Sequence, residues 1–233
     1  MKELNIFEIK LKIYLTNNIL SNNALEEIAH LIDSCLIKTE KYHDFHNENT
    51  YKLYSYNSFN PVEADRLYKA GNIYDIVIRT VDTRLHEYLR KSINNERTKN
   101  IKALDLISSK LKADHIEKLY SITPVIIKND SGYWRNGLDV KDYENRIKIN
   151  LIKKYNYLTG NKLEEDFPLF NMISFNNKVP IGCDYKNIRL LGDKVDLIIA
   201  DNESAQSLAK IAIGAGIGEM NSRGYGFVNY RYL

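Results

Sequence analysis

The chain has 233 residues, of which 44% are hydrophobic and 27% charged, so it is long enough for one large or two small domains with a buried core. Its net charge of +3 is mildly basic and by itself is weak evidence for a polyanionic partner. It shows no signal sequence, transmembrane run or lipidation motif, so we expect a cytoplasmic protein that does not bind a membrane. Cys35 and Cys183 lie far apart in the sequence, and we expect both to be reduced.

The first half of the chain alternates strand and helix signals. In residues 6–15, apolar side chains alternate with mostly charged ones, which predicts a strand with one apolar face. A helix is expected after a cap at Asn22 or Asn23, where apolar residues recur at helical spacing up to residue 38. The order β-α-β-β-α-β that results is typical of a ferredoxin-like unit. Its remaining elements, two strands, a second helix and a fourth strand, are predicted at residues 51–59, 73–81, 82–93 and 102–112.

The second half repeats this order less distinctly. No Pro-, Gly- or Ser-rich linker separates the halves, so we expect them to pack tightly. The sequence predicts an α+β protein of two tandem ferredoxin-like (RRM-like) domains, residues 1–120 and 121–233, with a glycine-rich loop before the last strand. The elements of the second half are a strand, a helix, two weak strands, a strand, a helix and a final strand, at residues 121–128, 140–160, 171–175, 186–191, 193–200, 202–214 and 225–233.

Residues 214–227, GAGIGEMNSRGYGF, hold five of the eleven glycines of the chain. Neither the Walker pattern nor the dinucleotide fingerprint fits their spacing, and the loop runs from a helix to a strand, the reverse of a mononucleotide loop. A glycine that ends the helix would explain Gly214 or Gly216 but none of the later glycines. Because bare backbone lets N–H groups approach an anion, we favour a ligand-binding loop.

Gly216, Gly218, Gly224 and Gly226 form a G-x-G-x5-G-x-G pattern between the last predicted helix and the last strand. In a tandem ferredoxin-like protein, this loop resembles that of the repeat-associated RNA-binding superfamily of CRISPR systems. Within the superfamily, the chain is similar to the endoribonuclease that processes CRISPR precursor RNA. Further segments that fit this enzyme lie at residues 51–61, 68–80, 121–128 and 191–199.

The resemblance implies CRISPR repeat RNA as the partner, with other subunits of a CRISPR effector complex and a second copy of the chain left open. We expect the four glycines to hold the RNA backbone by main-chain N–H groups. Within the same loop, Arg223 is the best candidate for a phosphate contact, although it also fits an ordinary exposed loop arginine.

The resemblance also implies RNA cleavage without a metal or other cofactor, in which the 2′-hydroxyl attacks the scissile phosphate and leaves a cyclic phosphate and a 5′-hydroxyl. This chemistry needs a base that titrates near neutral pH, a cation and an acid. In the family, a catalytic histidine between the first helix and the second strand is followed by a lysine, and His46 with Lys52 fits this spacing best. His43, Tyr42 and water are left open as the acid, because the family's catalytic tyrosine in the first helix has no counterpart.

Other interpretations of these residues stay open. His43 and His46 also fit a solvated loop, and a metal site would need more ligands than this pair supplies. A non-catalytic RNA-binding subunit of a CRISPR effector complex is the main alternative function. A third interpretation is a pair of ferredoxin-like domains that has a regulatory role or binds a small molecule and has no role with RNA.

Overall fold

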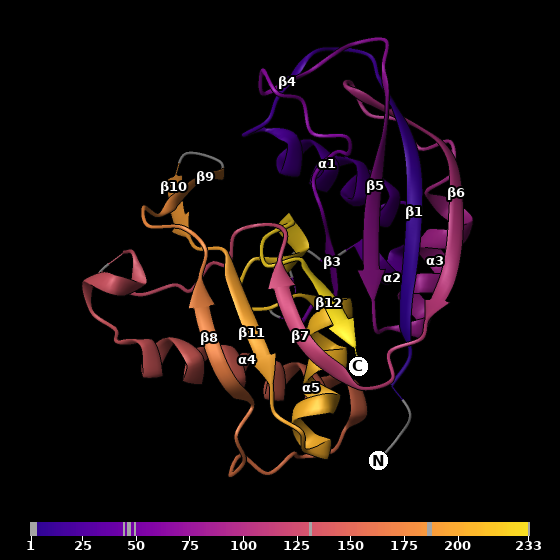
Figure 1. Ribbon diagram of the computed structural model, residues 1–233. Helices are drawn as coiled ribbons and strands as arrows, with labels where there is room; N and C mark the ends of the chain where they lie inside the picture. The colour runs from indigo at the N-terminus through magenta and orange to yellow at the C-terminus, as the bar shows by residue number, and fades with distance from the viewer. Residues whose placement is uncertain are drawn as a thin grey trace.

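The computed structural model describes residues 4–43, 45, 48, 50–130, 132–185 and 188–232 (Figure 1). Its two halves each contain a four-stranded antiparallel sheet. Between its strands, the first half also carries a short helix, α2 (Glu40–His43), and a two-stranded pair, β2 (Ile19–Leu20) with β4 (Leu67–Tyr68). Within the described residues, no helix combines the length and the apolar character needed to cross a membrane.

The first sheet has the strand order β3-β5-β1-β6. Strand β1 shows the predicted alternation, since Ile9, Leu11 and Ile13 are buried while Lys10 and Lys12 are exposed. The buried face of β1 packs in one apolar cluster with both helices of this half, so the helices cover the same face of the sheet. The main elements are β1 (Ile6–Leu15), α1 (Ala24–Leu36), β3 (Tyr54–Tyr56), β5 (Ile73–Thr80), α3 (Thr83–Ser92) and β6 (Ile101–Leu111).

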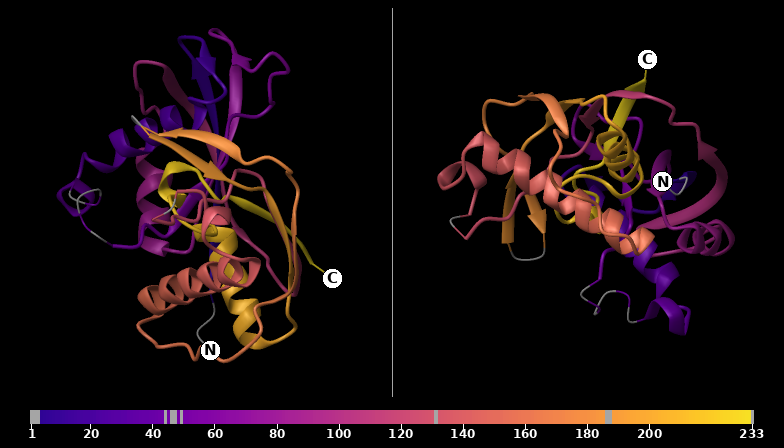
Figure 2. Two further views of the ribbon diagram at one scale, coloured as in Figure 1. Left: turned by 90° about the vertical axis from the view of Figure 1, so that its left-hand side faces the viewer. Right: turned by 90° about the horizontal axis from the view of Figure 1, so that it is seen from below.

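The second sheet has the equivalent order β12-β7-β11-β8, and α4 and α5 cover one of its faces (Figure 2). A capping box of Asp139 and Asp142 begins α4, and Gly160 ends it in the left-handed conformation, at φ 73°. The side chain of Asn202 caps α5. The main elements are β7 (Ile116–Ser121), α4 (Val140–Thr159), β8 (Phe170–Phe175), β11 (Val195–Ile199), α5 (Glu203–Ala215) and β12 (Val228–Tyr232).

The tandem ferredoxin-like fold is therefore confirmed, but the strand predicted at residues 121–128 is wrong. The first strand of the second sheet is β7, which pairs with both β11 and β12. Residues 122–128 contain Pro124, which has no N–H to donate to a ladder, and only isolated bridges form there, at Val125 and Ile126. Because the predicted boundary at residue 120 falls inside β7, we propose that the two domains divide within residues 112–115.

One hairpin extends beyond the regular fold. Strands β9 (Ile181–Tyr185) and β10 (Ile188–Gly192) pair with each other between β8 and β11 in the sequence. The sequence predicted β10 at residues 186–191 but not β9, where Gly182 interrupts the β-branched and aromatic pattern of a strand.

The halves share a buried junction. Arg79 on β5 donates to Glu8 Oε2 at 2.7 Å and to the carbonyl oxygen of Val228 on β12, also at 2.7 Å. Its guanidinium also lies 4.6 Å from the ring centroid of Phe227. Ile6, Leu53 and Val81 of the first half belong to the apolar cluster of the second half. The tight packing expected from the missing linker is present.

Candidate functional site

The glycine-rich loop links α5 to β12 and is buried between the two halves. Its four motif glycines, Gly216, Gly218, Gly224 and Gly226, all have positive φ, between 66° and 85°. All four are buried. Because side chains with a Cβ rarely adopt this conformation, the backbone path itself requires glycine at these positions.

The main-chain N–H groups of the loop bond within the protein. Those of Gly216, Gly224 and Gly226 donate to the carbonyl oxygens of Ala212, Asn221 and Pro124 at 2.8, 2.9 and 2.8 Å. At Gly218, a Cβ would stand 2.7 Å from the carbonyl oxygen of Ile126. In this structure the N–H groups of Gly216, Gly224 and Gly226 are therefore engaged within the protein. That the motif glycines contact RNA stays a prediction.

Asn221 holds the loop in shape from inside. Its Nδ2 donates to the carbonyl oxygens of Ile217 and Tyr225, both at 2.9 Å. Its Oδ1 accepts from Lys154 Nζ at 2.6 Å, and the same Nζ donates to the carbonyl oxygen of Gly216 at 2.8 Å. One amide and one ammonium thus fasten the end of α5 to the loop.

Lys154 was not foreseen from the sequence. It is 3% exposed, and burial lowers its pKa to about 7, while the charge of Glu219 acts in the opposite direction. Its burial could have been inferred from its position in the sequence. Lys154 lies three residues after Leu151 and seven after Ile147, on the apolar stripe of α4. A lysine on such a stripe indicates a buried partner.

The other side of the loop packs on the first half. A Cβ on Gly224 would stand 2.6 Å from Tyr56 Cε2 and 2.7 Å from Leu25 Cδ2. Next to it, Arg223 Nη1 pairs with Asp33 Oδ2 on α1 at 2.6 Å, and both side chains are largely buried. The arginine is therefore part of the junction between the halves rather than a fully exposed loop residue.

The structure describes only part of residues 40–52, the segment in which the sequence predicts the catalytic residues. His46, the predicted base, lies outside the described residues. His43 ends the short helix α2 and is exposed. Tyr42 is only 6% exposed, and its ring lies 4.9 Å from that of Tyr88. Its burial raises the pKa of Tyr42, and its role as a proton donor stays a prediction.

Lys52 lies where this segment reaches the glycine-rich loop. Its Nζ donates to the carbonyl oxygen of Glu48 at 2.5 Å and lies 5.3 Å from the ring centroid of Phe45. Burial lowers the pKa of Lys52, Glu48 opposes this effect, and the positive charge of Arg223 adds to it. The charge of Arg223 thus acts on Lys52, although the two residues are 171 positions apart in the sequence.

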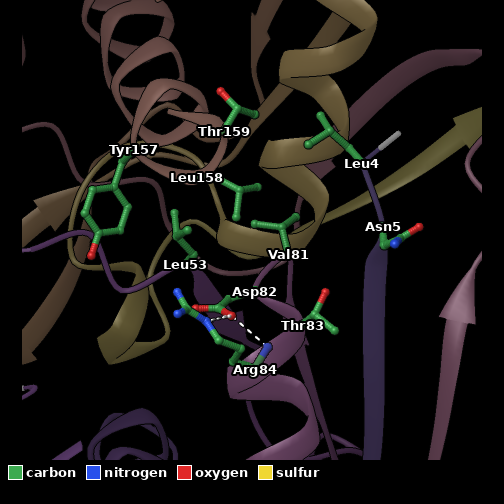
Figure 3. Close-up of a pocket in the computed structure, with 10 residues that line it drawn as sticks. All are labelled: Leu4, Asn5, Leu53, Val81, Asp82, Thr83, Arg84, Tyr157, Leu158 and Thr159. Atoms are coloured by element: carbon green, nitrogen blue, oxygen red, sulfur yellow. Dashed lines mark hydrogen bonds and ion pairs between the residues drawn. The ribbon is translucent and has the colours of Figure 1, made fainter. Parts of the chain in front are cut away.

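A cavity of about 550 Å³ is lined by residues of both halves (Figure 3). The first half contributes Leu53, the neighbour of Lys52, and the second half contributes Tyr157 at the end of α4. The full lining is Leu4, Asn5, Leu53, Val81, Asp82, Thr83, Arg84, Tyr157, Leu158 and Thr159.

A search of the described residues for three or more His, Cys, Asp or Glu side chains placed to hold a metal ion finds no such group. The candidate site consists of the cations Lys52 and Arg223 and of residues 40–52, within which the described residues include His43.

Comparison with known proteins agrees with this fold. The family model described as CRISPR associated protein Cas6, C-terminal, matches residues 108–230, more than half of the chain. The chain therefore belongs to the Cas6 family of CRISPR-associated proteins.

Three solved structures share the fold over nearly the whole chain. A CRISPR associated protein Cas6 has 19% identity and a TM-score of 0.70, with 97% of this chain and 99% of that one covered. A RAMP protein that binds different RNA substrates has 15% identity, a TM-score of 0.70 and the same coverage. The product of a Cas6-related gene from Pyrococcus furiosus has 13% identity and a TM-score of 0.70, with 97% and 98% covered. No curated protein matches the sequence.

Proposed function

We propose that the protein is an endoribonuclease that cleaves CRISPR repeat RNA and so generates mature guide RNAs. Membership of the Cas6 family supports RNA processing in general. The observation that carries the proposal is that Lys52, at the end of residues 40–52, is partly buried and that the positive charge of Arg223 in the glycine-rich loop helps to lower its pKa. Two cations at the junction of two RRM-like domains suit a bound phosphate.

In the proposed reaction, His46 removes the proton of the 2′-hydroxyl next to the scissile phosphate. The 2′-oxygen forms a bond to phosphorus, and the bond from phosphorus to the 5′-oxygen breaks, which leaves a 2′,3′-cyclic phosphate and a 5′-hydroxyl. Lys52 stabilises the negative charge that develops on the phosphate oxygens. His43 or water returns a proton to the leaving oxygen. No step requires a metal ion.

The second candidate function is a non-catalytic RNA-binding subunit of a CRISPR effector complex. It is favoured by one observation: α1 (Ala24–Leu36) contains no tyrosine, so the family's catalytic tyrosine is missing. The RAMP protein that shares this fold is described as binding RNA substrates, which suits either candidate.

The test is an incubation of the purified protein with its own repeat RNA in excess chelator. Cleavage at one site is the expected result, and an RNA with a 2′-deoxy sugar before the scissile phosphate should bind but stay intact, because its nucleophile is missing. Binding of the unmodified RNA without cleavage would replace the enzyme with the non-catalytic subunit. Cleavage of the deoxy RNA would exclude 2′-hydroxyl attack.

A further inference from the structure

The cavity shown in Figure 3 contains none of the residues assigned so far to catalysis or to the glycine-rich loop. Its volume of about 550 Å³ lies within the range of small-ligand sites, and its walls come from both halves of the chain. Leu53 in its lining follows directly after Lys52 in the sequence, so the backbone that carries the proposed catalytic cation continues into the cavity wall.

The walls combine an apolar floor with an aromatic rim. Tyr157 is 53% exposed and stands at one side of the cavity in Figure 3, with Leu53 and Leu158 beside it. Apolar side chains make up the floor: Leu4, Leu53, Val81 and Leu158. An accessible aromatic ring next to an apolar floor suits a flat, partly apolar group that can stack.

The opposite rim carries a positive charge. The side chain of Arg84 is 78% exposed, and Figure 3 shows its guanidinium beside Asp82. The carboxylate of Asp82 accepts hydrogen bonds from the N–H groups of Arg84 and Leu85, as the N-cap of α3, and lies 3.9 Å from Arg84 Nε. Because Asp82 already caps the helix, Arg84 can contact an anion such as a phosphate at the rim.

Tyr157 also contacts the histidine segment. Its ring centroid lies 5.9 Å from that of Tyr51, the residue before Lys52. A base stacked on Tyr157 would therefore contact a ring that packs against Tyr51, the residue before Lys52. This contact connects occupation of the cavity to the geometry of the proposed reaction.

We propose that this cavity binds one unstacked base of the repeat RNA, from a nucleotide that flanks the scissile phosphate, with Tyr157 stacking on the base and Arg84 contacting the adjoining phosphate. The proposal rests on the proposed function for the identity of the RNA. Single-stranded RNA is recognised in this way, by splayed bases on aromatic rings and phosphates on arginine.

The test measures affinity for repeat RNA made uncleavable by one 2′-deoxy sugar at the scissile position. A set of such RNAs carries a single abasic nucleotide at each position around that site. With the parent protein, one abasic position should weaken binding by about 5- to 100-fold, the range of a lost base–aromatic stack. Tyr157→Ala should weaken binding of the intact RNA to the same degree and should lose no further affinity with that abasic RNA. Tyr157→Phe, which keeps the ring, should behave as the parent.

Arg84→Ala provides a second measurement at an exposed position, where folding is not at stake. It should reduce the salt slope of the logarithm of affinity by about one. Two results together would overturn the proposal. The first is a salt slope for Arg84→Ala equal to that of the parent. The second is that every abasic RNA loses as much affinity with Tyr157→Ala as it loses with the parent. A parent that binds repeat RNA without cleaving it would overturn only the proposed function. A parent that binds no repeat RNA would overturn both.

Discussion

Two regions looked equally functional in the sequence, and the structure separates them. The glycine-rich loop is buried, its main-chain N–H groups bond to the protein, and Asn221 and Lys154 fill its interior. The segment of residues 40–52 meets that loop at its far end, with His43 exposed and Lys52 partly buried. A motif can therefore mark a family because it builds the junction of two domains, and we propose that the chemistry belongs to the segment of residues 40–52.

The largest effect is expected in the histidine segment. His46→Ala should lower the single-turnover cleavage rate by about 10²- to 10⁴-fold, the usual cost of a lost general base, with RNA affinity nearly unchanged. His43→Ala should cost less if water is the acid, and should also slow cleavage if His43 is the acid. A parent-like rate for a folded His46→Ala protein would remove His46 from the reaction.

Substitutions in the glycine-rich loop should lower the free energy of unfolding rather than the cleavage rate. A Cβ on Gly226, at φ +70°, would collide with the carbonyl oxygen of Ile217, and neither backbone can yield easily. Gly226→Ala should lower the free energy of unfolding by about 3 kcal/mol or more. Gly160→Ala is the control, because Gly160 has φ +73° with nothing within 4 Å of an added Cβ, and it should cost about 1 kcal/mol.

Urea unfolding of the two variants separates these costs. Equal destabilisation by Gly226→Ala and Gly160→Ala would show that the loop is not packed as described.

A smaller, pH-dependent effect is expected at Lys154. Its pKa of about 7 in the folded state lies below the usual lysine value of about 10.4 in the unfolded chain. Between these values the unfolded state binds more protons, so this residue makes stability rise with pH above about 7, by at most about 1.4 kcal/mol per pH unit.

The free energy of unfolding of the parent, minus that of Lys154→Met, should therefore increase from pH 7 to pH 9. Taking the difference cancels the titration of other groups. A difference that stays flat over this range would mean that Lys154 keeps its charge when buried.

The smallest effect is expected at Arg223. Arg223→Ala should weaken RNA binding mildly and reduce the salt slope of the logarithm of affinity by about one, because one phosphate contact is lost. It should also lower stability, since its pair with Asp33 is largely buried. Asp33→Asn serves as the control, as it breaks the ion pair and keeps the arginine. The same salt slope in Arg223→Ala and the parent would leave Arg223 with a structural role alone.

Periodicity in the sequence was sufficient for most of the fold. The alternation in β1 is a local signal, and the structure confirms it. The side-chain caps of α3 and α5 are also local interactions. By contrast, β7 carries the adjacent charges Glu117 and Lys118, which interrupt the apolar pattern of a strand. Its pairing with β11 and β12 comes from tertiary contacts.

The site was less predictable, for a similar reason. Positive φ at the motif glycines could be inferred from residue type, but whether their N–H groups face a ligand or the protein depends on the partner surface. That surface includes Pro124, Tyr56 and Leu25, which are distant in sequence. The effect of Arg223 on the pKa of Lys52 is equally a product of how the halves pack.

The most direct test of the central claim is the chemical identity of the RNA ends after cleavage in excess chelator. Mass spectrometry of the two products should find a 2′,3′-cyclic phosphate on the upstream fragment and a 5′-hydroxyl on the downstream fragment, because the 2′-hydroxyl is the nucleophile. A 3′-hydroxyl with a 5′-phosphate, or cleavage that stops when metal ions are removed, would contradict the account.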